Sequence, residues 1–161
     1  MKTTYAIASL VFAALLCTGC VPDEICRLDT NIVAGLECRW DSVTNEGTIL
    51  TMERWDDITM HGIGKDSLLY DGATNIEQLG LPLRKDSGEV VTAFLLRRRN
   101  TDDTLWIKHK NESHFESMAC GCFVYHHIDT VWATKHFIDS VYIVNSNVTP
   151  FKEEHIRAIL Q

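Results

Sequence analysis

Basic residues are scarce in this chain of 161 residues, which carries 15 Lys and Arg against 22 Asp and Glu and has a formal net charge of −7. Proteins that bind nucleic acid usually present a basic face to the phosphates. The composition therefore argues against nucleic acid as a partner. Proline is also rare, with three residues, and low-complexity runs are absent from the sequence. We therefore expect no linker that divides the chain into several domains.

Long hydrophobic runs are also missing. The apolar run at residues 5–16 covers 12 positions, whereas a helix that spans a bilayer needs about 20. The run follows Lys2 and precedes Thr18, Gly19 and Cys20. This order is typical of a secretory signal that ends at the cysteine of a bacterial lipoprotein, with an ordinary secretory peptide as the alternative. We predict that Cys20 becomes the lipidated first residue of the mature chain.

This interpretation divides the chain into a signal peptide at residues 1–19, a lipidated tether at 20–25 and one folded domain at 26–161. Acyl chains on Cys20 would bury many methylenes, each worth about 0.8 kcal/mol, and so hold the protein stably at a membrane. Pro22, Asp23 and Glu24 suit an extended, solvated tether. The remaining residues are enough to bury the core of one domain.

Four cysteines lie beyond the predicted signal and lipidation site: Cys26, Cys38, Cys120 and Cys122. An exported protein meets an oxidising environment that favours disulfides. Two residues apart on a strand, Cys120 and Cys122 would have Cα atoms about 6.5–7 Å apart, at the outer limit of disulfide geometry. We predict a bridge from the N-terminal cysteines to the Cys120 region, with free buried thiols as the alternative.

Short segments rich in β-branched and aromatic residues follow one another along the chain, separated by turn residues such as Gly64-Lys65-Asp66 and 100–103. About eight strands at roughly ten-residue spacing predict an all-β fold, a single antiparallel β-sandwich, with a calycin-like β-barrel as the alternative. For the tail, Thr149-Pro150 could begin a helix, but a closing strand fits equally well. The predicted strands are 31–40, 48–54, 57–63, 67–70, 90–98, 104–110, 122–134 and 138–144.

Two segments nearly repeat, 127–132 and 137–142, each reading aromatic-Ile-Asp-hydroxyl-Val-aromatic. We interpret them as two adjacent strands of one sheet, because the spacing is too short for a repeat architecture.

Aromatic side chains suggest where a ligand could bind. Trp40, Trp106 and Trp132 lie within predicted strands, so we expect them in the core. Trp55 lies among the charged residues 53, 54, 56 and 57. We therefore predict that Trp55 is the exposed tryptophan and a ligand contact.

Signatures of catalysis are weak in this sequence. A nucleophile on a sharp turn or a paired-acid motif is not found, so we expect a protein that is not an enzyme and uses no cofactor. The alternative is a metal site in the segment Cys120–His127, where Cys120, Cys122 and His126 could face one side of a strand. His126 and His127 alternate faces and could not jointly bind one ion.

Three features together resemble a family of uncharacterised envelope lipoproteins of Bacteroidota, a domain of unknown function: Cys26 with Cys38, the stretch 114–121 and the stretch 136–145. The resemblance runs from about Cys26 to the C-terminus. It implies an all-β fold and a Gram-negative envelope, and it carries over no catalytic residue. Asp23 and Glu24, just after the lipidated cysteine, resemble the export signals that send such lipoproteins to the cell surface.

The same resemblance draws attention to the triplet Asp-(Ser/Thr)-aliphatic, which resembles the acceptor for protein O-glycosylation in these bacteria. The triplet occurs five times, where average composition predicts about one. Turns that lead into strands also create such triplets. Because a modified hydroxyl must be accessible, Ser42, Ser67 and Thr104 at predicted loop edges are better candidates than Thr130 and Ser140.

The function that we expect from the sequence is a lipid-anchored module of the cell envelope, at the outer membrane, with a structural or binding role. Its partners would be the membrane, through the anchor, and an envelope protein or a glycan. The alternative is the metal-dependent protein built around Cys120–His127.

Overall fold

The computed structural model describes residues 26–28, 31–44 and 47–161, with the backbone alone for 41–44 and 47–50. Its described residues form no helix and eleven strands. The all-β prediction is thus confirmed. The strands are β1 (Ala34–Thr44), β2 (Gly47–Glu53), β3 (Ile58–Gly62), β4 (Leu68–Ala73), β5 (Gln78–Leu81), β6 (Glu89–Arg98), β7 (Thr101–Ser117), β8 (Gly121–Ala133), β9 (Ile138–Ile143), β10 (Asn147–Val148) and β11 (Ile156–Leu160).

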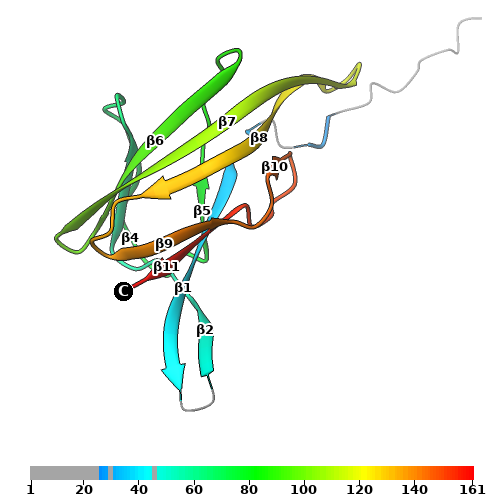
Figure 1. Ribbon diagram of the computed structural model, residues 1–161. Coiled ribbons are helices and arrows are strands. Elements are labelled where there is room, and N and C mark those ends of the chain that lie inside the picture. The colour runs from blue at the N-terminus through cyan, green and yellow to red at the C-terminus, as the bar shows by residue number, and fades with distance from the viewer. Residues whose placement is uncertain (1–25, 29–30, 45–46) are drawn as a thin grey trace, which may run out of the picture.

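The strands form two sheets (Figure 1). One has the order β2-β1-β11-β9, with β5 also paired to β1. The other has the order β10-β8-β7-β6-β3-β4. The pair β1–β11 is parallel, with Leu36 opposite Ile156, and the other strand pairs are antiparallel.

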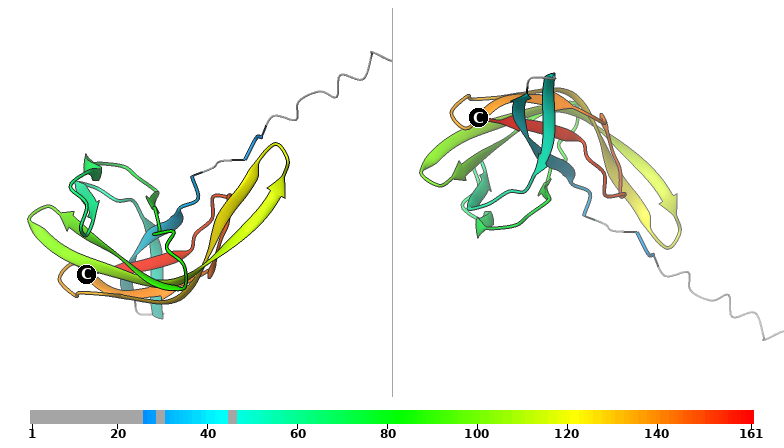
Figure 2. Two further views of the ribbon diagram at one scale, coloured as in Figure 1. Left: turned by 90° about the horizontal axis from the view of Figure 1, so that it is seen from above. Right: turned by 90° about the horizontal axis from the view of Figure 1, so that it is seen from below.

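The six-stranded sheet curls around the core, and its consecutive strands β6, β7 and β8 are long (Figure 2). Its strand β7 has 17 residues, which corresponds to a length of about 55 Å. The hairpin of β7 and β8 therefore projects past the rest of the domain, and its end lies next to the N-terminal segment 26–28 (Figures 1 and 2).

Alternation of buried and exposed residues explains how the long strands face the core. On β6, Val90, Thr92, Phe94 and Leu96 are buried and the residues between them are more exposed. Successive side chains of a strand point to opposite faces, so one face of β6 is apolar apart from Thr92. The facing layer comes from the other sheet, with buried side chains of β1, β5 and β11.

The structure resolves the open alternative for the C-terminal tail and corrects the prediction for the two near-repeated segments. The tail forms the closing strand β11, because Ile156, Ala158 and Leu160 are buried when β11 pairs with β1. The near-repeated segments are not neighbours in one sheet: β8 and β9 belong to different sheets. Between β8 and β9 the chain passes from one sheet to the other. Similarity between two local sequences does not determine which strand each of them pairs with.

The corner between β8 and β9 is built around the buried carboxylate of Asp103, which comes from β7. It accepts hydrogen bonds from Thr134 Oγ1 at 2.5 Å and from the backbone N–H groups of Phe137 and Ile138 at 2.8 and 2.9 Å. The backbone N–H and the Nδ1 of His136 lie at 3.0 and 2.9 Å from the same carboxylate. One side chain thereby holds the crossover from one sheet to the other.

Candidate functional site

An open groove of about 810 Å³ lies on the side of the six-stranded sheet where β3 meets β6. Its walls are the turn between β3 and β4, the loop 82–88 that leads into β6, and the first half of β6. We call it the β3–β6 groove. It is lined by Gly62, Ile63, Gly64, Lys65, Ser67, Leu69, Pro82, Leu83, Arg84, Lys85, Asp86, Val91, Thr92, Ala93 and Phe94.

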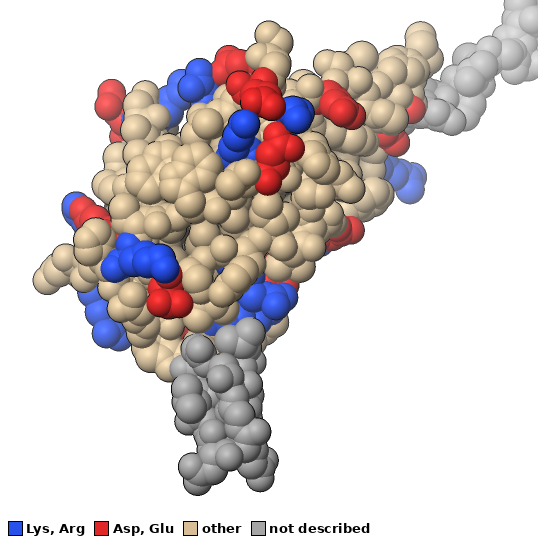
Figure 3. Space-filling view, in the orientation of Figure 1, with Lys and Arg blue, Asp and Glu red and all other residues tan. Residues whose placement is uncertain are grey.

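The rim of the groove carries more positive than negative charge. Lys65, Arg84 and Lys85 line it against a single acidic residue, Asp86, which forms an ion pair with Arg84 at 2.7 Å. Lys65 and Lys85 are exposed, and within the described part of the chain neither has an ion-pair partner. On the face shown in Figure 3, Lys and Arg are otherwise interspersed with Asp and Glu. The groove thus offers two unpaired ammonium groups in a protein whose net charge is negative.

Apolar side chains form the walls between these charges. Ile63 is 54% exposed, Val91 44% and Leu69 39%. Exposed apolar side chains grouped around a concavity are typical of ligand-binding sites, because their contact with water is unfavourable. The arrangement fits a ligand that carries an anionic group beside an apolar portion.

A network of polar side chains, centred on the half-buried Asn111, fixes the wall of the groove formed by loop 82–88. Asn111 Nδ2 donates to the carbonyl oxygens of Arg84 and Asp86 at 2.9 and 2.5 Å. The backbone N–H of Arg84 donates to Thr92 Oγ1 at 3.1 Å. Strands β6 and β7 therefore hold this loop through its backbone, and the side chains of Arg84 and Lys85 remain outside.

Two buried histidines complete the network. Asn111 Oδ1 lies 3.0 Å from His109 Nδ1 and 2.6 Å from His126 Nδ1. Because an amide oxygen only accepts, both Nδ1 atoms must carry the proton. His109 Nε2 then accepts from Thr92 Oγ1 at 2.8 Å. The Nε2 of His126 is buried and has no hydrogen-bond partner among the described residues.

The histidines of this network are neutral at neutral pH. Burial, with smaller contributions from the charges of His109 and Lys85, lowers the pKa of His126 to about 4. Burial also lowers the pKa of His109, although its hydrogen bond to Asn111 opposes the shift. His127, the next residue along β8, is exposed, so the prediction that His126 and His127 face opposite sides is confirmed. The network therefore supports the groove without adding charge to it.

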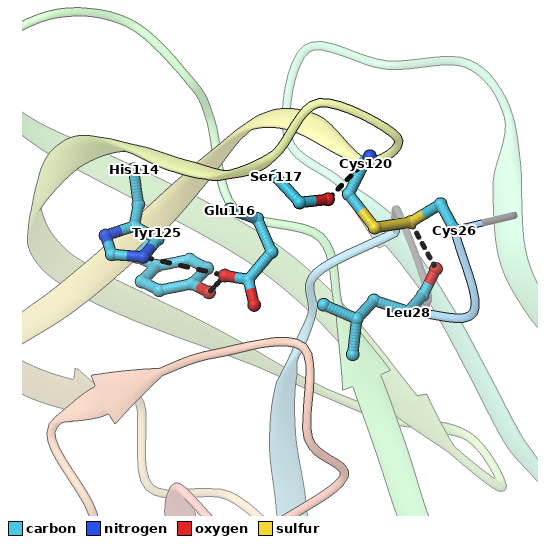
Figure 4. The surroundings of a disulfide bond; sticks show 7 residues. All are labelled: Cys26, Leu28, His114, Glu116, Ser117, Cys120 and Tyr125. Atoms are coloured by element: carbon cyan, nitrogen blue, oxygen red, sulfur yellow. Dashed lines mark hydrogen bonds and ion pairs between the residues drawn. A yellow bond between two sulfur atoms is a disulfide. The ribbon is translucent and has the colours of Figure 1, made fainter. Parts of the chain in front are cut away.

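A disulfide joins Cys26 to Cys120 across 94 residues, at the end of the β7–β8 hairpin (Figure 4). This confirms the predicted bridge between the N-terminal cysteines and the Cys120 region. Next to it, Ser117 Oγ accepts from the backbone N–H of Cys120 at 3.0 Å. The other two candidates are free thiols: Cys38 is buried and Cys122 is exposed. Burial raises the pKa of the Cys38 thiol to about 12, so it stays protonated and unreactive.

The arrangement of tryptophans is the reverse of the expected one. Trp55 is fully buried, and its Nε1 donates to the carbonyl oxygen of Leu36 at 3.2 Å. It is therefore no exposed ligand contact. Trp40 and Trp132, expected in the core, are 38% and 41% exposed. Trp106 is stacked on Trp132 across β7 and β8, with 6.0 Å between the ring centroids.

The charged neighbours of Trp55 do not make its own side chain exposed. Arg54 pairs with Glu77, and Asp56 accepts from the backbone N–H of Asn75 at 2.8 Å, both on the outside. Adjacent side chains of an extended chain point in opposite directions. Charged residues at 54 and 56 therefore agree with a tryptophan that points inward.

The candidate glycosylation sites differ in accessibility. Ser67 is exposed and comes directly before β4. Thr104 is half-buried within β7, next to the buried Asp103, so its expected place at a loop edge is wrong. Ser42 belongs to β1, and its side chain lies outside the described residues. Modification of Ser67 stays a prediction.

The residues of the alternative metal site are not brought together by the fold. Cys120 is bonded to Cys26, Cys122 is exposed and His126 is buried. In the described ranges there is no group of three His, Cys, Asp or Glu side chains placed to hold a metal ion.

The predicted signal peptide, the predicted lipidation site Cys20 and the predicted tether to residue 25 lie outside the described residues. Within the described part of the chain, no helix is long and apolar enough to cross a membrane.

Sequence reasoning missed the groove, whose lysines come from two separate loops. It also missed the network of Thr92, His109 and Asn111. One signal was present: Thr92 shares the alternation of the apolar residues 90, 94 and 96, and His109 that of 105 and 107. Polar residues at inward positions of a strand predict a buried hydrogen-bond network.

Comparison with known proteins places most of the domain in one family. The model of a family of unknown function, DUF6452, matches residues 57–160, from just before β3 to the end of β11. No curated protein and no solved structure matches the chain.

Proposed function

Because the chain belongs to DUF6452, a family of unknown function, we propose a function from the chemistry of its own residues: a lipid-anchored binding module of the bacterial cell envelope. The anchor is Cys20, and the β domain binds a ligand in the β3–β6 groove. The lipoprotein-type signal at residues 1–19 and the resemblance to envelope lipoproteins of Bacteroidota support this role.

One observation carries the proposal: the disulfide between Cys26 and Cys120. Disulfides persist in oxidising environments and are rare in the cytosol, so a structural disulfide fits an exported protein. Cys26 follows Cys20 by only six positions. The bridge therefore fastens the domain directly behind the predicted anchor.

The Cys20→Ser variant tests the anchor. We expect it to fold normally, since Cys20 precedes the domain, and to appear in the soluble periplasmic fraction instead of the membrane fraction. The measurement is fractionation of the host envelope followed by detection of the protein. Cys122→Ser, which changes an exposed free thiol, should stay with the membrane. If Cys20→Ser also stays with the membrane, the anchor proposal is wrong.

The side chains that line the β3–β6 groove also favour one class of ligand. Lys65 and Lys85 supply two ammonium groups, and Ile63, Leu69 and Val91 supply apolar contact. We propose an amphiphile with an anionic head, such as an acyl carboxylate, bound with its head at the lysines and its chain along the apolar wall. Charge-assisted hydrogen bonds of this kind are stronger than neutral ones.

A fluorescent fatty acid tests the groove, with the matching fatty amine as the ligand of opposite charge. We expect the wild-type protein to bind the acid more tightly than the amine. The double variant Lys65→Ala with Lys85→Ala should bind the acid about tenfold more weakly, since loss of about 1.4 kcal/mol corresponds to that factor.

The double variant Lys135→Ala with Lys152→Ala is the matched control, because it removes the same charge from exposed positions outside the groove. It should bind the acid as wild type does. Equal weakening in both double variants would show a general charge effect, and no binding of the acid to wild type would reject this ligand class.

A further inference from the structure

We infer that the tip of the β7–β8 hairpin, residues 115–122, rests on the lipid bilayer and inserts Phe115 and Met118 past the headgroups into the outer part of the acyl region. The inference rests on the proposed lipid anchor at Cys20. It assigns a second membrane contact to the folded domain and so defines which end of the molecule faces the bilayer.

The covalent path from the anchor to the hairpin tip is short. Six residue steps separate Cys20 from Cys26, and an extended chain covers at most about 22 Å in that number of steps. The disulfide then brings the Cα of Cys120 to 4.8 Å from that of Cys26. Whatever conformation the tether has, the tip stays within about 27 Å of the lipidated residue, which is roughly half the length of β7.

The rest of the domain extends away from the end of the β7–β8 hairpin. In Figures 1 and 2, the end of the β7–β8 hairpin lies beside the segment 26–28, whereas the hairpin of β1 and β2 projects from the opposite end of the molecule. A bilayer at Cys20 therefore meets the β7–β8 tip before it meets the other strands.

The chemistry of the tip suits a lipid surface. Met118 is 93% exposed and Phe115 is 59% exposed. Residues 117–124 contain no charged side chain. Contact of this stretch with lipid would therefore desolvate no charged group. Burial of one Met and one Phe side chain is too weak to hold a protein at a membrane alone, but it is enough to orient one that is already anchored.

The charged side chain next to this stretch, that of Glu116, points away from the end of the hairpin. Glu116 accepts from the hydroxyl of Tyr125 at 3.1 Å and lies 3.5 Å from His114 Nε2. The ring of His114 is stacked on that of Tyr125. Figure 4 shows Glu116 turned toward this pair. The acidic group is thus tied to the shaft of the hairpin and leaves its end apolar.

Tryptophan fluorescence in vesicles with brominated acyl chains tests the inference. The full mature, lipidated protein is reconstituted into phosphatidylethanolamine and phosphatidylglycerol vesicles as two variants, Met118→Trp and Met52→Trp. Met52 is the matched control, since it is 61% exposed and lies in β2 at the far end. Bromine quenches only tryptophans that reach the acyl region.

We expect the added tryptophan of Met118→Trp to lose most of its emission in brominated vesicles, and that of Met52→Trp to keep it. If the lipidated protein floats with the vesicles but both added tryptophans keep their emission, the contact of the tip is rejected while the anchor stands. If the mature wild-type chain carries no lipid and does not float, the proposed anchor is wrong and the inference falls with it.

Discussion

Asp103→Ala is expected to lower the free energy of unfolding by about 3–5 kcal/mol, because it leaves buried hydrogen-bond donors without an acceptor. The side chain is fully buried and receives hydrogen bonds from Thr134 and from the backbone of residues 136–138. Burial alone would raise the pKa of Asp103, but these hydrogen bonds outweigh it and hold the pKa below its ordinary value. The carboxylate is therefore ionised in the folded protein, and its removal opens the corner between the sheets.

Urea unfolding followed by tryptophan emission measures this effect. The matched control is Asp102→Ala, which removes the adjacent carboxylate, exposed and paired with Arg97 at 2.6 Å. Exposed ion pairs add little to stability, so the control should unfold close to the wild-type midpoint. Equal losses in the two variants would show that Asp103 is no more important to the corner than a surface aspartate.

The double variant Cys26→Ser with Cys120→Ser is expected to lose about 4–5 kcal/mol of stability, the loop-closure entropy of a bridge over some 90 residues. The bridge closes a loop of 94 residues that contains β1 to β7. Without it, the segment at Cys26 and the hairpin end are joined only through the folded sheets. Replacing both cysteines avoids a new free thiol that could pair elsewhere.

Unfolding with and without a reductant separates this effect from a local defect. Reduced wild type should unfold at the midpoint of the double variant, and the double variant should not respond to reductant. Cys122→Ser is the control and should behave as oxidised wild type, because Cys122 is exposed and unbonded. If reduction does not move the wild-type midpoint, the bridge does not contribute to stability.

Several predictions that depended on neighbouring residues were confirmed, although those for Trp55 and Thr104 were wrong. The strand predicted at residues 90–98 is β6, because β-branched and aromatic residues in a short stretch favour extended backbone. The turn at Gly64-Lys65-Asp66 does connect β3 to β4. The candidate bridge to the Cys120 region followed from the limited reach of two cysteines in one strand.

Predictions that needed a distant partner were wrong or stayed open. Whether the tail is a helix or a strand depends on β1, which lies more than a hundred residues earlier and pairs with it. The separation of β8 and β9 depends on Asp103, a residue of β7. The β3–β6 groove exists because two loops from different parts of the chain meet beside β6.

The amino-acid order alone was sufficient for the all-β class and for the choice of cysteines that could be bridged, because each depends on spacing or composition within a short stretch. The single domain and the lipoprotein-type signal at Cys20 stay predictions from the same kind of local pattern. Tertiary structure decided which tryptophans are buried, which sheet each strand joins, that Lys65 and Lys85 line one groove, and that the end of the β7–β8 hairpin lies beside residues 26–28. Those properties arise from contacts between residues far apart in sequence, whose energies depend on packing that no local pattern encodes.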